Sequence, residues 1–554
     1  MKKTLLSSAF ALLIGLIFSA CSSSTDLEKA RNLITEEGIM QHIEALAHDS
    51  TMGRAPATEG ERMTVDYLIR EFKNIGLVGG MPDGGFIQEV PVVRQTTAPG
   101  SVMQITRNNR VIHRFDYFTD MMAWPAAGQE HVSIRDAELV YVGYGIIAPE
   151  EDWDDYKGKD VTGKILVFKN SDPYSFPEKF AGTARLYYGR WSYKYEIAQE
   201  LGALGAIIIH TIPTAGYGWN VVSGSWARPR FALEAEMGES DTELNAWLTH
   251  HHSRALFESA GLNLDEQLQR AESPDFEPVV LEGLRLNIDL HADYDRLTLK
   301  NVLATLPGSD RTLKNEYVIF SAHHDHLGVG RPVDGDSIFN GAMDNASGTA
   351  AIIELARAYQ SIAPSLRRSV MFAAVGGEES GLLGSRYFAN NLPMPTGKVS
   401  ANFNIDMING FGKTEDIIVV GKGRTSIDRF MIEEAEAFGR IVLPDQQPEQ
   451  GFYYRSDHFS FARVGIPAFY PNPGVSYIGK PDNHFEEVIQ PHLNFIYHTV
   501  HDRVENIMTL EGAVEDMRLI FNVAYRVIND DTIQSWMPGD EFEAARLRSI
   551  EALK

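Results

Sequence analysis

Short apolar runs in the second half of the chain alternate with stretches whose apolar residues recur at helical spacing. The runs are rich in β-branched and aromatic residues, as buried strands are, and they cover residues 317–321, 369–375, 399–407, 417–420 and 466–470. After the first run, residues 347–359 carry the period of an amphipathic helix. Strands that alternate with helices predict an α/β fold in which a mixed β-sheet is flanked by helices.

The first half of the chain begins with helical patterns and then changes to strands. Residues 61–72 predict an amphipathic helix that Gly76 closes, and residues 86–93 predict a strand. Short alternating runs between 101 and 124 predict further strands. The character of the chain changes near Gly128, where glycines begin to separate the strands.

Beyond this point, strands at 137–145 and 156–168 precede a helix, a Gly-Ala turn and a buried strand within 194–210. The block YKGKDVTGKILV, followed by a helix that ends in LGALGAIII, resembles the protease-associated (PA) domain, a β-rich module inserted in several exopeptidases and proteases. The resemblance implies that residues 131–286 are such an insert. Residues 27–130 and 287–554 would then form the main domain.

The N-terminus has the pattern of a secretory signal. Lys2 and Lys3 precede an apolar run at 5–18 and small residues that lead to Cys21, and Phe-Ser-Ala-Cys resembles the box at which bacterial lipoproteins are cleaved and acylated. We therefore expect residues 1–20 to be removed, and the exported protein to be lipid-anchored through Cys21 in the bacterial outer membrane, facing the periplasm or the cell surface. The alternative is ordinary cleavage after Ala20, which leaves a free thiol.

The composition narrows the possible partners. Cys21 is the only cysteine, so we expect no disulfide framework despite export. A formal net charge of -25 disfavours nucleic acid and acidic lipid headgroups as partners. The 554 residues are enough for two or three domains, and nothing in them indicates an oligomeric state.

Polar residues with metal-binding side chains follow the predicted strands of the second half. Metal sites that hydrolyse amides need histidine and carboxylate ligands, with one position open for water. The candidates in chain order are His323, Asp344, the pair Glu378 and Glu379, Asp406 and His498. Five ligands, one of them a shared carboxylate, would hold two metal ions.

The pair Glu378 and Glu379 offers both a ligand and a base. Neighbouring side chains on extended or tightly turned backbone point in different directions, so one carboxylate can hold a metal while the other faces the attacking water. The alternative is a solvated pair of surface glutamates. The apolar strand before the pair, the two glycines and the SGLLGS that follows favour the functional interpretation.

Together these motifs resemble the co-catalytic di-zinc exopeptidases, a family that includes bacterial leucyl aminopeptidase, aminopeptidase S and the glutamate carboxypeptidases. The matching strings are SAHHDHLG, FNGAMDNASG, FAAVGGEESGLLGSRYF, NFNIDM, SDHFSFARVGIPAFY and YHTVHDRVENI, in the family's order over residues 317–507. A weaker resemblance extends to HIEALAHDSTMGRAPATEGE near the N-terminus.

The resemblance implies two Zn²⁺ ions and a role for each matching residue. Asp344 would bridge the zinc ions, with a cis peptide bond after it. His323 and Asp406 would complete one zinc site, and Glu379 and His498 the other.

The resemblance also assigns three residues that do not bind zinc. Glu378 would be the general base. Asp325 would orient the imidazole of His323, and Asp457 would do the same for His498.

Several other residues depart from the pattern or compete with it. Met343 stands where relatives usually have Asp, and His324 where they often have Tyr; neither position is a ligand in the family. We expect polar surface or supporting roles, not metal ligation, for the remaining histidines near the motifs, which are His326, His458, His484, His492 and His501.

The leading hypothesis is an exported zinc aminopeptidase that hydrolyses N-terminal residues from peptides. A glutamate-carboxypeptidase-like carboxypeptidase or a dipeptidase is the alternative within the family, with Arg331, Arg386 or Arg455 to bind a substrate carboxylate. A non-catalytic binding protein on the same scaffold is a more distant alternative. Such proteins lose ligands or the base, whereas this chain keeps all six residues. A one-zinc acyl-transfer relative such as glutaminyl cyclase is disfavoured by the presence of both His323 and Asp406.

Overall fold

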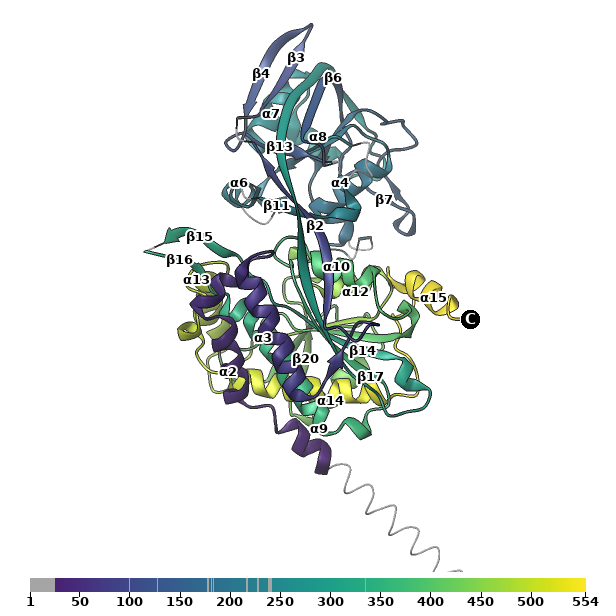
Figure 1. The fold of residues 1–554 in the computed structure, drawn as a ribbon. Helices are drawn as coiled ribbons and strands as arrows, with labels where there is room; N and C mark the ends of the chain where they lie inside the picture. The colour runs from purple at the N-terminus through teal and green to yellow at the C-terminus, as the bar shows by residue number, and fades with distance from the viewer. Residues whose placement is uncertain are drawn as a thin grey trace, which may run out of the picture. The chain divides into compact units, whose positions relative to one another are not determined.

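The computed structural model describes residues 25–554, apart from 99, 127, 177–178, 181, 183, 216–217, 227–228, 238–241 and 334. The predicted signal segment and Cys21 lie outside the described residues. The chain forms two compact units (Figure 1). The first unit comprises Met1–Val90, Thr298–Gln446 and Ser456–Lys554, and the second comprises Pro91–Leu297 and Gln447–Arg455.

A mixed sheet forms the centre of the first unit. Its strands, in spatial order, are β1 (Val78–Gly79), β13 (Val279–Leu306), β17 (Ser369–Val375), β14 (Tyr317–His323), β18 (Val399–Asn404), β21 (Ala468–Asn472), β19 (Asp416–Val420) and β20 (Ile441–Pro444). Strands β17, β14, β18 and β21 run parallel, while β13 and β19 run antiparallel to their neighbours within that block. The prediction of a mixed α/β sheet is confirmed.

Helices cover this sheet because its central strands are apolar on both faces. The chief helices are α2 (Glu36–Leu46), α3 (Glu59–Ile75), α9 (Gly348–Ser361), α10 (Leu383–Asn390), α11 (Asp428–Ala437), α12 (His458–Arg463), α13 (Gln490–Ile496), α14 (Glu511–Asn529) and α15 (Glu543–Glu551). On one face, Phe320 stacks between Phe372 and Phe403, with ring centroids 5.4 Å apart in each pair. Helix α3 ends where predicted, at Gly76 with a φ of 94°.

A second sheet organises the second unit. Its strands, in spatial order, are β4 (Arg110–Asp116), β3 (Val102–Arg107), β13, β6 (His131–Tyr141), β9 (Ile165–Lys169), β10 (Gly205–His210), β12 (Leu244–Thr249) and β5 (Met121–Pro125). Helices α4 (Trp191–Glu200), α7 (His250–Ser259) and α8 (Leu264–Arg270) contribute to its core. That this unit is a PA domain stays a prediction.

The second unit begins earlier in the chain than the expected boundary at 131. Strands β3 and β5 lie before that boundary and pair with β13 and β12 of the second sheet. Their partners are more than a hundred residues away in sequence, so local patterns gave no sign of this pairing. The long strand β13 contributes residues to both units.

The shorter elements complete the chain. They are β2 (Ile87–Thr97), β7 (Ile147–Ala148), β8 (Trp153–Asp154), α5 (Ile212–Ala215), α6 (Trp219–Trp226), β11 (Arg230–Leu233), β15 (Gly328–Val333) and β16 (Asp336–Phe339). Among the described residues, no helix is both long and apolar enough to cross a bilayer.

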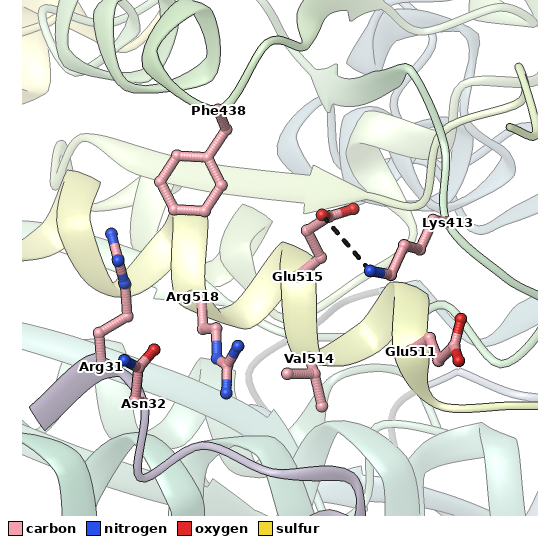
Figure 2. Close-up of a pocket in the computed structure, with 8 residues that line it drawn as sticks. All are labelled: Arg31, Asn32, Lys413, Phe438, Glu511, Val514, Glu515 and Arg518. Carbon is pink, nitrogen blue, oxygen red and sulfur yellow. Dashed lines mark ion pairs between the residues drawn. The ribbon is translucent and has the colours of Figure 1, made fainter. Parts of the chain in front are cut away.

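A small cavity of about 150 Å³ opens on the first unit beside α14 (Figure 2). The guanidinium of Arg31 lies 5.4 Å from the centre of the Phe438 ring, and Lys413 pairs with Glu515 at 4.0 Å. None of the predicted metal ligands lines this cavity. The chemistry predicted from the sequence therefore lies elsewhere in the unit.

Candidate metal centre

His323 is the last residue of β14 and lies at the carboxyl end of this central strand. The imidazole is fully buried, and its Nε2 atom lies 3.2 Å from Oδ1 of Asp344 and 3.3 Å from Oδ1 of Asp406. Asp406 follows β18, the parallel neighbour of β14. These three side chains converge closely enough to hold a metal ion.

A second histidine approaches the other oxygen of the same carboxylate. Nε2 of His498 lies 3.0 Å from Oδ2 of Asp344 and 3.1 Å from Oε2 of Glu379. Asp344 therefore presents one oxygen to each histidine. A carboxylate in this arrangement could contribute one oxygen to each of two metal sites.

The turn before α9 determines where Asp344 points. The peptide bond between Asp344 and Asn345 is cis, as the resemblance implied. The side chain of Asn345 accepts hydrogen bonds from Gly348 N and Met407 N, at 2.9 and 3.0 Å. The same amide thus joins the N-terminus of α9 to the loop that carries Asp406.

The glutamate pair lies on the turn that follows β17, and Asp325 holds this turn. The backbone amides of Glu378 and Glu379 donate to the two oxygens of Asp325, at 3.1 and 3.4 Å. An oxygen of Asp325 also lies 3.7 Å from Nδ1 of His323. From the sequence we predicted only the contact of Asp325 with His323. The hydrogen bonds from the amides of the turn to Asp325 were not predicted, because backbone amides leave no signal in a sequence.

The surroundings of Asp457 differ from the expectation that it orients His498. Burial raises the pKa of Asp457 to about 7, and the charges that act on it belong to His323, Asp406 and Asp325. The neighbouring Ser456 hydroxyl donates to Asp406 at 2.5 Å. The Ser-Asp segment therefore lies on the His323 side of the site.

Among the histidines set aside on sequence grounds, His326 lies in the cluster itself. It is fully buried, and its Nδ1 atom is 2.7 Å from Oε1 of Glu379. Together with Asp344 and Glu379 it forms a second group able to hold a metal. Its spacing in HHDH gave no means of distinguishing it from His324, whose Nε2 atom instead lies 2.9 Å from the carbonyl of Lys300.

Two further residues near the site complete its description. Met343, at the position where relatives carry Asp, packs in an apolar cluster with Phe411 and Tyr477. The ring of Tyr497 stacks on that of His498, with centroids 3.9 Å apart, and Tyr497 stays half exposed, at 51%. Partial burial, followed by the negative charges of Asp344 and Glu379, raises the pKa of Tyr497 above its ordinary value.

The buried charges of the cluster act strongly on one another. Burial lowers the pKa of His323, but Glu378 and Asp406 outweigh it and raise that pKa well above 6.5. Burial raises the pKa of Glu379, but His498 holds it at about 2. For Glu378, burial dominates and raises the pKa well above its ordinary value.

The donor set fits zinc. Imidazole nitrogens and carboxylate oxygens are zinc ligands, and each of the two histidines has its Nε2 atom between two carboxylates. Against the effect of burial, the same carboxylates raise the pKa of both imidazoles, which favours the protonated forms of His323 and His498. Zinc would replace those protons.

The mixed sheet gathers histidines and carboxylates at the carboxyl ends of its parallel strands. Residues 301–518 match the model of peptidase family M28. In structure, the chain is similar to an aminopeptidase from Aneurinibacillus sp. strain AM-1, with a TM-score of 0.50 and 19% identity. The similarity covers 93% of this chain and 97% of the other, and it shows a shared fold.

Curated relatives match over shorter stretches. Aminopeptidase YwaD of Bacillus subtilis is 30% identical over 187 residues, which are 33% of this chain and 37% of the relative. Leupeptin-inactivating enzyme 1 of Streptomyces exfoliatus is 31% identical over 30% of this chain and 34% of its own length. A probable zinc metalloprotease of Pyrenophora teres f. teres is 34% identical over 22% of this chain and 24% of its length. The matches therefore span about a quarter to about a third of these relatives.

Zinc affinity should depend on pH through the two site histidines. Their pKa values are raised in the zinc-free protein, because nearby carboxylates outweigh burial, and zinc binds only the neutral imidazole. Affinity should therefore keep rising from about pH 6 to about pH 8, beyond the range in which an ordinary imidazole loses its proton. Competition with a chelating dye across this range measures it. An affinity that is constant above about pH 6.5 would contradict the expectation.

Proposed function

We propose that this protein is a di-zinc aminopeptidase, which releases N-terminal residues from peptides. The observation that carries the proposal is Asp344, whose two oxygens each face a different histidine. The match of residues 301–518 to peptidase family M28 supports the chemistry. The names of two relatives, aminopeptidase YwaD and leupeptin-inactivating enzyme 1, support peptides as substrates.

The chain's own residues would perform the proton transfers. When bound, zinc supplies a Lewis acid and lowers the pKa of a bound water. Glu378 lies in the cluster but outside the two ligand sets, so its carboxylate is placed to take the proton of that water and to pass it to the leaving amine.

Export and anchoring belong to the proposal as well. The lysines, the apolar run and Cys21 at the N-terminus support a lipoprotein that acts outside the cytoplasm. The large negative charge leaves the peptide as the expected partner, rather than nucleic acid.

Zinc stoichiometry tests the bridging role of Asp344. Wild-type protein should bind two zinc ions per chain, and His323→Ala or His498→Ala should each retain one. Asp344→Ala should lose both, because each site would lose a ligand at once. Elemental analysis after dialysis gives the counts. One zinc in the wild type, or equal losses in all three variants, would exclude a bridging carboxylate.

Glu378→Gln tests the base. The amide has the shape of the carboxylate but cannot accept the water's proton, so kcat should fall about 10²- to 10⁴-fold while zinc content is unchanged. Glu433→Gln is the control, because the Glu433 side chain is 58% exposed and, among the described residues, forms an ion pair with Arg526 outside the metal cluster. Activity of Glu378→Gln within about twofold of the wild type would show that another group is the base.

Blocked peptides distinguish the aminopeptidase from its alternatives. An aminopeptidase should release residues from peptides with a free amine and leave N-acetylated peptides intact. Mass spectrometry of the products identifies which end is shortened. Release from the C-terminus of acetylated peptides would instead establish the carboxypeptidase, and zinc binding without cleavage of any peptide would favour the non-catalytic protein.

A further inference from the structure

Arg54 is a fully buried arginine whose partners are all backbone carbonyls in the described structure. Its Nε atom donates to His324 O at 2.8 Å, and Nη2 donates to Gly341 O at 2.8 Å. Its Nη1 atom donates to Leu46 O at 3.0 Å and to Asn340 O at 2.5 Å. The planar guanidinium thus fixes three backbone segments with one rigid fork.

Two of these segments carry the metal ligands. His324 follows His323 directly, and Asn340 and Gly341 lead into the turn that ends at Asp344. A shift of the carbonyl of His324, or of the carbonyls of Asn340 and Gly341, would move the backbone that carries a metal ligand. Arg54 therefore links the two ligands His323 and Asp344 through their backbones.

The backbone around Arg54 adopts a costly conformation. Met52, Gly53 and Arg54 have φ values of 49°, 66° and 54°, all in the left-handed region. A Cβ atom on Gly53 would lie 2.3 Å from the carbonyl oxygen of Phe339, so the turn packs directly against the segment that leads to Asn340. Consecutive left-handed residues persist where the surroundings hold them, often next to functional sites.

Asp502 holds the other side of the same turn. Its carboxylate oxygens accept hydrogen bonds from Met343 N at 2.7 Å and Asp344 N at 3.0 Å. Its backbone carbonyl accepts from Ala342 N at 3.2 Å. Residues 340–344 are therefore held by carbonyl contacts to Arg54 at one end and by amide contacts to Asp502 at the other.

The positive charge of Arg54 is a second feature that connects this residue to the site. A buried guanidinium is costly unless negative groups surround it. Burial lowers the pKa of Arg54 to about 10, while Asp502, Asp325, Asp344 and Glu379 act in the opposite direction. Arg54 thus supplies a permanent positive charge to a site rich in carboxylates, whether or not metal is bound.

We propose that Arg54 and Asp502 are positioning residues that fix Asp344 in its bridging orientation and thereby set the protein's affinity for zinc. This inference rests on the proposed function, because it takes the cluster to be a zinc site. Neither residue touches the reacting atoms. Both act by holding the backbone of residues 340–344.

The chain offers matched controls for both residues. Arg546 is also buried, with 1% exposure, and it donates to the backbone carbonyls of Gln534 and Val399. Asp416 is buried and accepts from two consecutive amides, Val475 N and Ser476 N. Each control makes the same kind of contact as its counterpart, but at a place that holds no metal ligand. If loss of a buried charge acts only on stability, the site variants and the control variants should show the same effect on zinc affinity.

The test compares Arg54→Lys, Arg54→Met and Asp502→Asn with Arg546→Met and Asp416→Asn. Zinc dissociation constants come from competition with a chelating dye, and Tm is measured with zinc and after its removal. The site variants should bind zinc about 10- to 100-fold more weakly, and zinc should raise their Tm by less than it raises the wild-type Tm. The control variants should lose stability but keep the wild-type zinc affinity.

The outcomes separate this inference from the proposed function. A wild type that binds no zinc and cleaves no peptide overturns both. A wild type that binds zinc, with site variants that lose Tm but keep its dissociation constant, overturns the positioning role alone. Equal losses of zinc affinity in Arg546→Met and Arg54→Met would also overturn it. If Arg54→Met does not fold, Asp502→Asn decides, because it keeps the side-chain shape and loses only the charge and one acceptor.

Discussion

The concentration of buried carboxylates at one edge of the first sheet is the constraint on which the rest of the site depends. Asp325, Asp344, Glu379, Asp406 and Asp457 lie among the same few histidines. Like charges in a medium of low polarity repel strongly. The arrangement persists only if cations, protons and backbone amides oppose this repulsion from every side.

Parallel strands explain why the ligands could be predicted from the sequence. β14, β17 and β18 are adjacent and parallel, so the residues that follow them meet at one edge. His323 is the last residue of β14, while Glu379 and Asp406 follow β17 and β18. A sequence pattern shows where a buried strand ends. The α/β class and the composition of the cluster could therefore be anticipated from short apolar runs and the polar residues after them.

The supporting groups could not be anticipated in the same way, since their contacts join distant segments through backbone atoms. Arg54 meets the carbonyl of Gly341 across almost three hundred residues, and Asp325 holds the amides of Glu378 and Glu379. Any residue supplies a carbonyl or an amide, so such partners have no sequence signature. The boundary of the second unit differed from the expected one for the same reason, because distant strand pairing determines it.

Permanent and exchangeable positive charges have different uses in this site. The imidazoles of His323 and His498 face the two oxygens of Asp344. A protonated imidazole balances the charge of a carboxylate, and a neutral one can bind a metal ion. The guanidinium of Arg54 keeps its charge and points at carbonyls instead. A lysine there could not reach several carbonyls with one planar group. If zinc replaces the imidazole protons, the backbone of residues 340–344 would therefore keep its geometry. Arg54, which holds this segment through its carbonyls, takes no part in the exchange.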